Sequence, residues 1–155
     1  MARFRVTCPD DKAIETLAAN MRQSDRDEME AMGHTDALEV VRRSVQCSDA
    51  NFSWAAYSGD KLLFIAGCSR FKDAPGVGVP WLLGTDELKH FTKTLTQVCK
   101  IEIKNMLNRY AVLMNVIDVR NVMTIRWLQS LGFEFKETLE INPGFPIIRF
   151  EVKDV

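Results

Sequence analysis

The 155-residue sequence has no excess of one charge sign and no long apolar run. Its 20 Lys and Arg residues are balanced by 21 Asp and Glu residues, so the composition does not favour general binding to nucleic acid or to acidic membranes. No stretch approaches the ~18 consecutive apolar residues that a membrane-spanning helix needs, and the first residues lack the apolar core of a signal peptide. We therefore expect a cytoplasmic protein with no membrane partner.

Histidine is scarce, and the four cysteines are widely scattered. The two histidines, His34 and His90, have no cysteine or carboxylate at metal-ligand spacing, and the cysteines form no C-x-x-C pair. This spacing argues against a zinc site and against a disulfide framework. We expect surface histidines, no metal, and four reduced, mostly buried thiols: Cys8, Cys47, Cys68 and Cys99.

The length and the apolar content are those of one folded domain. A domain has roughly 100–200 residues, and at this size a chain buries roughly 70% of its unfolded surface. The hydrophobic fraction of 46% is sufficient for such a core. We expect a single domain over residues 1–155.

The spacing of apolar residues predicts an alternation of strands and helices. The expected caps are Ser24, Thr35, Thr85 and Asn121, and Gly33 and Gly132 are expected to end helices. The order predicts an α/β domain with a mixed central sheet, N-terminal helices, one long central helix and a C-terminal hairpin. The expected strands are 3–7, 52–57, 61–66, 79–83, 111–117, 133–139 and 147–152, and the expected helices are 9–19, 25–32, 35–45, 86–109 and 122–131.

The segment from Asp118 to Phe133 resembles the C-terminal signature of the GCN5-related N-acetyltransferase (GNAT) superfamily. In that signature a strand ends, an Asn opens a helix, and the helix ends in Leu-Gly-Phe; Asn121 and residues 131–133 match. The order of elements over nearly the whole chain fits the same fold. The resemblance implies a GNAT fold and, in an active member, acetyl-CoA as the cofactor. The residues it implies for cofactor binding are Leu82, Leu83, Gly84, Thr85 and Asn121.

A closer resemblance covers two further stretches. Residues 20–28 and 78–88 are similar to stretches in a family of GNAT-like proteins of tailed bacteriophages, the internal virion protein A family. This resemblance implies a phage-encoded protein that acts in the host cytoplasm or in the virion. It also implies a protein partner, either a virion component or a host protein.

The turn before the predicted long helix departs from the superfamily pattern. Active members carry an Arg/Gln-x-x-Gly-x-Gly/Ala turn, whose backbone N–H groups hold the diphosphate of coenzyme A. Here the turn has one glycine, Gly84, no arginine, and two acidic residues, Asp86 and Glu87. Each carboxylate at a helix N-terminus stabilises the helix by about 0.3–1 kcal/mol and would repel a diphosphate there. Ordinary helix capping explains this turn without a cofactor.

A second departure concerns proton transfer. Seven residues after Asn121, where many acetyltransferases have a Tyr that protonates the departing thiolate, this sequence has Leu128. Leucine cannot donate a proton, and the two tyrosines, Tyr57 and Tyr110, do not match the motif. General acid–base assistance contributes typically 10²–10⁴-fold, so its loss would slow acetyl transfer rather than abolish it.

The second N-terminal helix borders the acceptor groove in the GNAT fold. The resemblance therefore implies a groove for an acceptor or a partner formed by Arg22, Asp25, Arg26, Glu28 and Trp81. The simpler interpretation is that the charged residues form a solvated helix face and that Trp81 fills the core. Nucleic-acid binding would draw only on a row of lysines on the long helix, which is more typical of a solubilising face: Lys89, Lys93, Lys100 and Lys104.

Two hypotheses of different class follow. We favour a phage GNAT-like protein that keeps the fold, has lost efficient acetyl transfer, and acts by contacts in virion assembly or with a host protein. The alternative is an active acetyl-CoA-dependent N-acetyltransferase of unknown acceptor. It would use backbone donors of residues 82–84 to polarise the thioester carbonyl, and Asp86 or Glu87 to take the amine proton. An open gap between strands 79–83 and 111–117 would leave room for a pantetheine arm.

Overall fold

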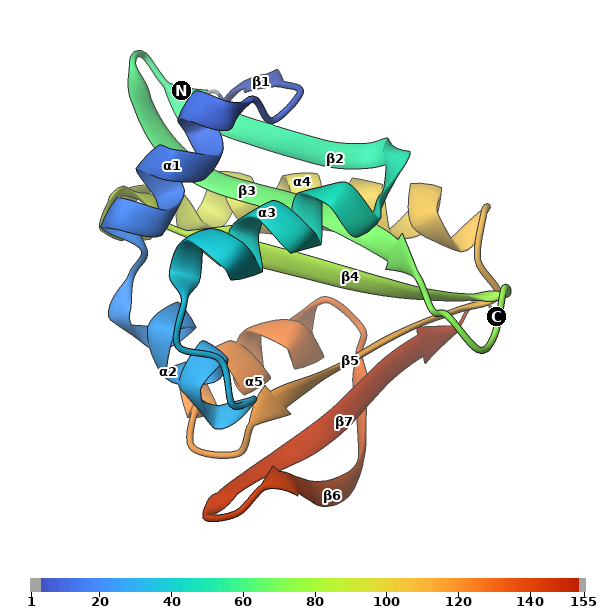
Figure 1. Cartoon of the computed structure of the whole chain (residues 1–155). Helices are drawn as coiled ribbons and strands as arrows, with labels where there is room; N and C mark the ends of the chain where they lie inside the picture. The colour runs from blue at the N-terminus through green and yellow to red at the C-terminus, as the bar shows by residue number, and fades with distance from the viewer. Residues whose placement is uncertain (1–3, 154–155) are drawn as a thin grey trace.

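The computed structural model describes residues 4–153, which form a twisted sheet with helices on both faces (Figure 1). The N-terminal half contains β1 (Arg5–Thr7), α1 (Asp11–Asn20), α2 (Gln23–Ala31), α3 (Ala37–Cys47), β2 (Ser48–Ser58) and β3 (Lys61–Arg70). The C-terminal half contains β4 (Val77–Gly84), the 3₁₀ helix η1 (Asp86–Phe91), α4 (Thr92–Leu107), β5 (Val112–Asp118), α5 (Val122–Ser130), β6 (Glu134–Asn142) and β7 (Phe145–Lys153).

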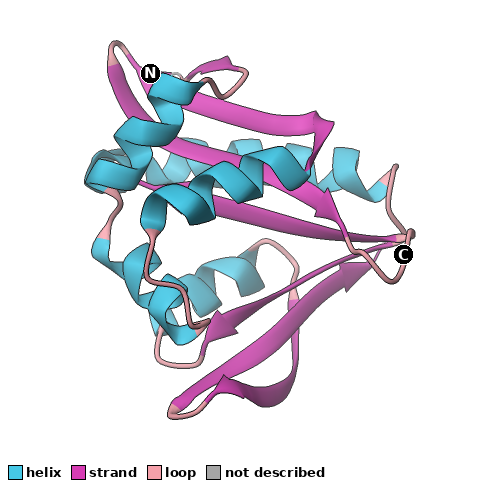
Figure 2. Cartoon of the chain, in the orientation of Figure 1, coloured by secondary structure: helices cyan, strands magenta, loops and turns pink. Residues whose placement is uncertain are grey.

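The strands follow the order β1-β2-β3-β4-β5-β7-β6. All neighbouring strands are antiparallel except β4 and β5, which are parallel and are connected through α4. Such a parallel pair needs a crossover connection, and α4 supplies it. Helices α1, α2 and α3 lie on one face of the sheet, and α4 and α5 lie on the other (Figure 2). The predicted α/β fold with a mixed sheet, N-terminal helices and a C-terminal hairpin is confirmed.

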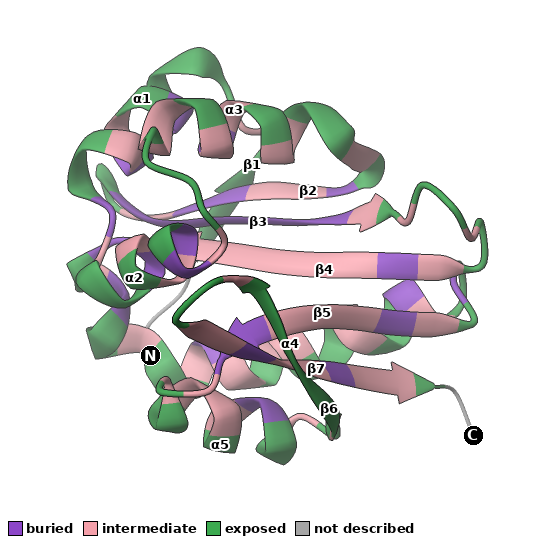
Figure 3. Ribbon diagram, turned by 60° about the horizontal axis from the view of Figure 1, so that its bottom comes forward, coloured by how far each residue is buried: buried purple, intermediate pink, exposed green. Residues whose placement is uncertain are grey.

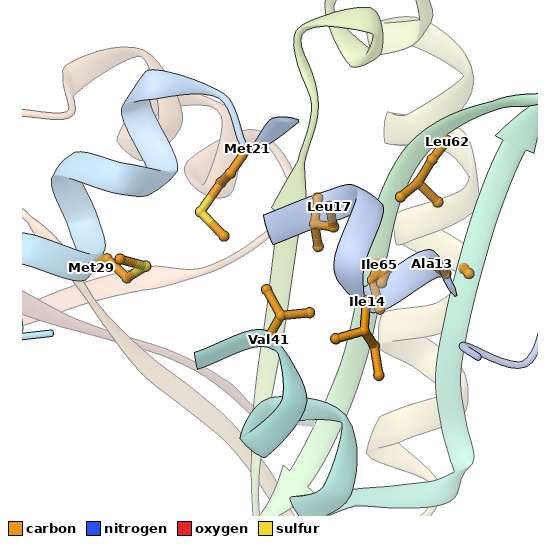
Figure 4. Packing of buried hydrophobic residues seen from close by; sticks show 9 residues of the cluster. Ala13, Ile14, Leu17, Met21, Met29, Val41, Leu62 and Ile65 are labelled. Atoms are coloured by element: carbon orange, nitrogen blue, oxygen red, sulfur yellow. The ribbon is translucent and has the colours of Figure 1, made fainter. Parts of the chain in front are cut away.

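The core has one layer on each face of the sheet. On the first face, Leu17, Val41 and Ile65 are fully buried between α1, α3 and β3, together with Met29 of α2 (Figure 4). On the other face, Phe64 of β3 packs in a separate cluster with side chains of α4. Neighbouring residues of β3 thus serve opposite layers, as the period of two along a strand requires.

The N-cap residues of the helices were predicted correctly for α5 but not for α2 or α3. Asn121 caps α5 as predicted, with Oδ1 accepting the Thr124 N–H at 3.4 Å. The predicted cap Thr35 is wrong, because the next residue, Asp36, accepts the Glu39 N–H at 3.2 Å. The predicted cap Ser24 is wrong as well, because α2 begins at Gln23, two residues before the predicted start, and Ser24 lies inside the helix.

The predicted helix over 86–109 is the largest difference. Residues 86–91 form η1, and the α-helix begins only at Thr92. Thr85 does not cap the helix; its hydroxyl donates to the Leu62 carbonyl of β3 at 2.8 Å. The Thr85 hydroxyl, which would cap the helix, is therefore engaged in a tertiary hydrogen bond to β3 instead. Part of another prediction, Arg3 in the first strand, lies outside the described residues, and β1 begins at Arg5.

The thiols are less buried than expected. Cys8 and Cys47 are exposed, Cys68 is buried, and Cys99 is half-buried, and all four are free. Burial raises the pKa of Cys68 and of Cys99 to about 12, so neither is a reactive thiolate at neutral pH. Within residues 4–153, no helix is long and apolar enough to cross a membrane.

Candidate functional site

A gap opens in the sheet between β4 and β5. The two strands pair only at Val77 with Val112 and at Gly78 with Leu113, and they then diverge toward their C-terminal ends (Figure 1). A cavity of about 460 Å³ occupies the gap. Its walls come from both faces of the sheet, with Met29, His34 and Ser44 on one side and Val98, Trp127 and Leu128 on the other. The gap between the strands is open, as a pantetheine arm would require.

Pro80 fixes which backbone groups of β4 point into this gap. Pro80 is paired with Cys68 of β3, but proline has no N–H and cannot take part in a pair that exchanges two hydrogen bonds. Hydrogen bonding to β3 therefore belongs to the odd-numbered residues, in agreement with the bond from the Thr85 N–H to the Leu63 carbonyl at 2.9 Å. The backbone groups of Pro80, Leu82 and Gly84 point to the β5 side.

At the end of β4, those groups already have partners from the N-terminal part of the chain. The Gly84 N–H donates to Asp25 Oδ2 at 2.7 Å, and the Gly84 carbonyl accepts the Arg22 N–H at 2.9 Å. Arg22 also forms an ion pair with Asp25, in which Nε donates to Oδ2 at 2.7 Å. A Cβ added at Gly84 would lie 2.9 Å from Leu88 and 3.4 Å from the Arg22 guanidinium, so this corner is densely filled.

In the middle of the gap, Asn115 of β5 takes the place of a strand partner. Its Nδ2 donates to the Pro80 carbonyl at 2.7 Å, and its Oδ1 accepts the Val116 N–H at 2.7 Å. One side chain thereby satisfies an acceptor of β4 and a donor of β5.

At the end of β5, the side chain that binds the strand backbone is Glu28 of α2. Both of its carboxylate oxygens accept the Asp118 N–H, at 3.0 and 2.9 Å, and Oε1 also accepts Asn121 Nδ2 at 3.3 Å. Helix α2 lies across the ends of β4 and β5 in the view of Figure 3. Asp25 and Glu28, one turn apart on this helix, therefore bind one strand each. Of the β4 groups directed into the gap, the N–H and carbonyl of Leu82 are left for a ligand.

Burial of these carboxylates has a cost. Desolvation raises the pKa of Asp25 above its ordinary value, although Arg22 and the Gly84 N–H act in the opposite direction. Desolvation also raises the pKa of Glu28, and the nearby charges of Asp118 and Asp25 raise it further. No cation is among the groups that shift the Glu28 pKa. Asp118 differs, because hydrogen bonds from Arg120 lower its pKa.

The structure brings most of the predicted site residues to this cavity. Its walls include four of the five residues predicted for the groove and three of the five predicted for cofactor binding: Arg22, Asp25, Glu28 and Trp81, and Leu82, Leu83 and Asn121. Gly84 and Thr85, also predicted for cofactor binding, are not among the residues that line it. Arg26 points elsewhere and donates to the carbonyls of Ala18 and Met21 at the end of α1. Asp86 and Glu87, predicted as bases, are not among the residues that line the cavity.

The turn after β4 does not fit a diphosphate. The Gly84 N–H is occupied by a carboxylate, and the turn continues into a 3₁₀ helix that carries Asp86 and Glu87 at its start. Lys61, the cation paired with Glu87 at 3.6 Å, is exposed and belongs to β3. An added diphosphate would meet like charge at the position where the superfamily pattern offers free N–H groups.

The tyrosines are also engaged outside the cavity. The Tyr110 hydroxyl donates to Asp49 at 3.0 Å, and the Arg5 guanidinium lies 4.4 Å from the Tyr57 ring centre. Burial raises the pKa of both phenols. At the position where the resemblance expects the phenol, Leu128 lines the cavity and is 9% exposed. Among the described residues, no tyrosine lines the cavity.

That Asn115 and Glu28 bind backbone groups of the strands beside the gap was not predicted from the sequence. The signal for Asn115 was present, because it is the single polar residue within the apolar run 111–117. The contacts of Asp25 and Glu28 with the strand ends span 59 and 90 residues of chain, so local patterns could not pair them. Within the described residues, no group of three or more His, Cys, Asp or Glu side chains could hold a metal ion.

The arrangement matches solved acetyltransferases along the whole chain. An N-acetyltransferase from Staphylococcus aureus Mu50 is 14% identical with a TM-score of 0.72, over 98% of this chain and 99% of that one. A ribosomal-protein-alanine N-acetyltransferase from Brucella melitensis is 13% identical with a TM-score of 0.71, over 96% and 99%. The fold is that of the GNAT N-acetyltransferases. A Bacillus subtilis acetyltransferase of this fold, solved in complex with CoA, is 10% identical with a TM-score of 0.66 and full coverage of both chains.

The comparisons by sequence found no match for this chain. No family model and no curated protein matches this chain. At these identities the solved structures establish the fold alone, and the function must be argued from the residues in the gap.

Proposed function

We propose that this protein is a phage-encoded GNAT-fold protein that has lost efficient acetyl transfer and acts by binding another protein. The observation that carries the proposal is that the chain's own side chains already bind backbone groups along the open gap. Asp25, Asn115 and Glu28 bind the backbone groups of β4 and β5 that would otherwise be free to pair with an inserted ligand. A pantetheine arm would have to displace charged and amide side chains that already satisfy these groups.

The missing acid and the acidic turn support the same proposal. Leu128 replaces the proton donor, and Asp86 and Glu87 place negative charge beside the turn where a diphosphate would bind. Either change alone would weaken acetyl transfer, and together with the occupied Gly84 N–H they affect cofactor binding and chemistry at once.

The proposed virion role rests on the two stretches that resemble phage proteins. In the structure these stretches touch each other, since Met21 pairs with Thr85 and both Arg22 and Asp25 bind Gly84. They therefore form one structural unit, the closed end of the gap. We propose that the protein works in the host cytoplasm or in the virion, with a virion component or a host protein as its partner.

Calorimetry and thermal unfolding with acetyl-CoA test the loss of cofactor binding. A site of about 10 μM affinity, filled at about 1 mM ligand, would stabilise the protein by about 2.7 kcal/mol, a rise of several degrees in Tm. We expect no saturable heat and no rise in Tm. Saturable binding in the low micromolar range would refute the proposal.

A second candidate function, acetyl-CoA-dependent N-acetyltransferase, is favoured by the open gap and its cavity of about 460 Å³. The predicted bases Asp86 and Glu87 do not line this cavity, whereas Glu28, predicted for the acceptor groove, does. If acetyl-CoA binds, the rate of acetyl transfer to a panel of amines should be measured for wild type and Glu28→Gln. A rate that falls in the variant would establish this second function.

A further inference from the structure

We propose that α2 is a lid over the gap, closed by Asp25 on the end of β4 and by Glu28 on the end of β5, and that ionisation of these two carboxylates favours its opening. The inference concerns access to the gap and is independent of what enters it. It starts from geometry: one helix carries two carboxylates, one turn apart, that accept backbone N–H groups from the two sides of the split sheet.

The lid is attached mainly through polar contacts. Helix α2 has the sequence QSDRDEMEA, and the only apolar side chains that it buries are Met29 and Ala31. An element with little buried apolar surface can open locally at a lower free energy than the whole fold. The polar attachments are the bonds of Arg22 and Asp25 to Gly84, the bonds of Glu28, the bonds of Arg26 to the Ala18 and Met21 carbonyls, and a bond from Asn142 to the Glu30 carbonyl at 3.3 Å.

The direction of the pH effect follows from linkage. A carboxyl group whose pKa is raised in the closed state binds its proton more tightly there than in the open state, where solvent restores the ordinary value. Protonation therefore favours the closed lid. The closed state loses stability as pH rises from the ordinary carboxyl pKa, about 4, through the raised pKa of each group. Above that range the lid opens most easily.

The charged groups around the pair agree with this direction. Arg22 faces Asp25, whereas Glu28 faces the carboxylates of Asp118 and Asp25. Arg120, which follows β5, binds Asp118. His34 lines the same cavity as both carboxylates. Arg22 therefore opposes the shift at Asp25, whereas the charges that face Glu28 add to the shift there.

Hydrogen exchange of individual amides, measured by NMR on the full-length protein, tests the lid. The Gly84 and Asp118 amides donate directly to the two carboxylates, and the Ile65 amide of β3 reports on the buried core. After correction for intrinsic exchange rates, we expect Gly84 and Asp118 to open more readily than Ile65. The opening constant at Asp118 should increase several-fold between about pH 4 and about pH 7.

Matched variants separate the lid from general fraying. Glu28→Gln keeps an oxygen acceptor and removes the charge, so the pH dependence of opening at Asp118 should become weaker, and the part that Asp25 contributes should remain. Glu30→Gln removes an exposed charge from the same helix and should leave the wild-type pH dependence intact. The proposal is overturned if Gly84 and Asp118 exchange together with Ile65 at every pH, or if the two variants behave alike.

Discussion

At the scale of single residues, the most informative feature is the half-buried carboxylate of Glu28, whose pKa no neighbouring cation lowers. Glu28 accepts hydrogen bonds from Asp118 and Asn121, yet desolvation still raises its pKa. Hydrogen bonding therefore compensates only part of the cost of burying its charge. A residue that lowers stability in this way and lines a cavity is a candidate for function.

Replacing Glu28 by Gln should increase stability at neutral pH. The free energy of unfolding should rise on the order of 1 kcal/mol, because the carboxamide avoids the cost of a buried charge and still accepts the Asp118 N–H. Urea unfolding at about pH 7 and about pH 4 measures the effect, and the gain should disappear near pH 4, where the wild-type group is protonated. A variant that is less stable than wild type at neutral pH would contradict this account of Glu28.

A second residue-scale feature is the close approach of backbone at Gly67 of β3. A Cβ there would lie 2.8 Å from the Phe52 carbonyl, 2.7 Å from Ser48 Oγ and 2.9 Å from the Trp81 indole nitrogen. Ser48 and Trp81 are themselves bonded at 2.7 Å, so neither is free to move away. This contact connects β2, β3 and β4 beside the gap.

Gly67→Ala should therefore destabilise the protein by about 1–3 kcal/mol, the usual cost of overpacking. Gly76→Ala is the matched control, because its nearest atom would be the Ala111 Cβ at 3.9 Å. Thermal unfolding of both variants distinguishes them. Equal Tm values for the two would show that β2 and β4 can move apart at Gly67.

At the scale of elements, the sequence predicted most helices and strands and misplaced several of their ends. The cap Asn121 is unambiguous, since Gly132 closes the same helix. Thr85 was misassigned because its hydroxyl has a carbonyl acceptor on β3, a partner that local spacing cannot reveal. Thr35 was misassigned because a second capping residue follows it directly.

The start of α3 permits a direct comparison of the two caps. Asp36→Ala should cost about 1 kcal/mol, because its side chain accepts the Glu39 N–H, while Thr35→Ala should have almost no effect. Urea unfolding of the two variants at neutral pH measures the difference. A larger loss for Thr35→Ala would show that α3 begins one residue earlier than described.

Part of the site was also available from the sequence at this scale. A proline inside a strand marks a residue whose backbone cannot donate to the paired neighbour. Pro80 was therefore a usable signal, but the side to which Leu82 and Gly84 turn their backbone groups follows only from the observed pairing of Pro80 with Cys68. The partners of those groups were not predictable, because Asp25 and Glu28 come from a helix that precedes both strands. Their pairing depends on the packing of α2 across the sheet.

At the scale of the whole molecule, the fold and the ability of the gap to bind a cofactor depend on different residues. The alternation of elements fixed the mixed sheet and the α4 crossover, and the split between β4 and β5 follows from pairing that stops after two residues. Whether such a split binds a cofactor depends on a few side chains. Here Asn115, Asp25 and Glu28 bind strand groups at the middle and at the end of the gap and leave those of Leu82 free.

Titration of the isotope-labelled protein with acetyl-CoA, followed through the amide signals of Gly84, Leu82 and Asp118, tests this account most directly. Because the chain's own side chains bind two of these amides, we expect all three signals to stay in place up to about 1 mM ligand, a concentration that would fill any site of about 10 μM affinity. A saturable shift of the Gly84 signal would show that acetyl-CoA displaces Asp25, and would contradict the account.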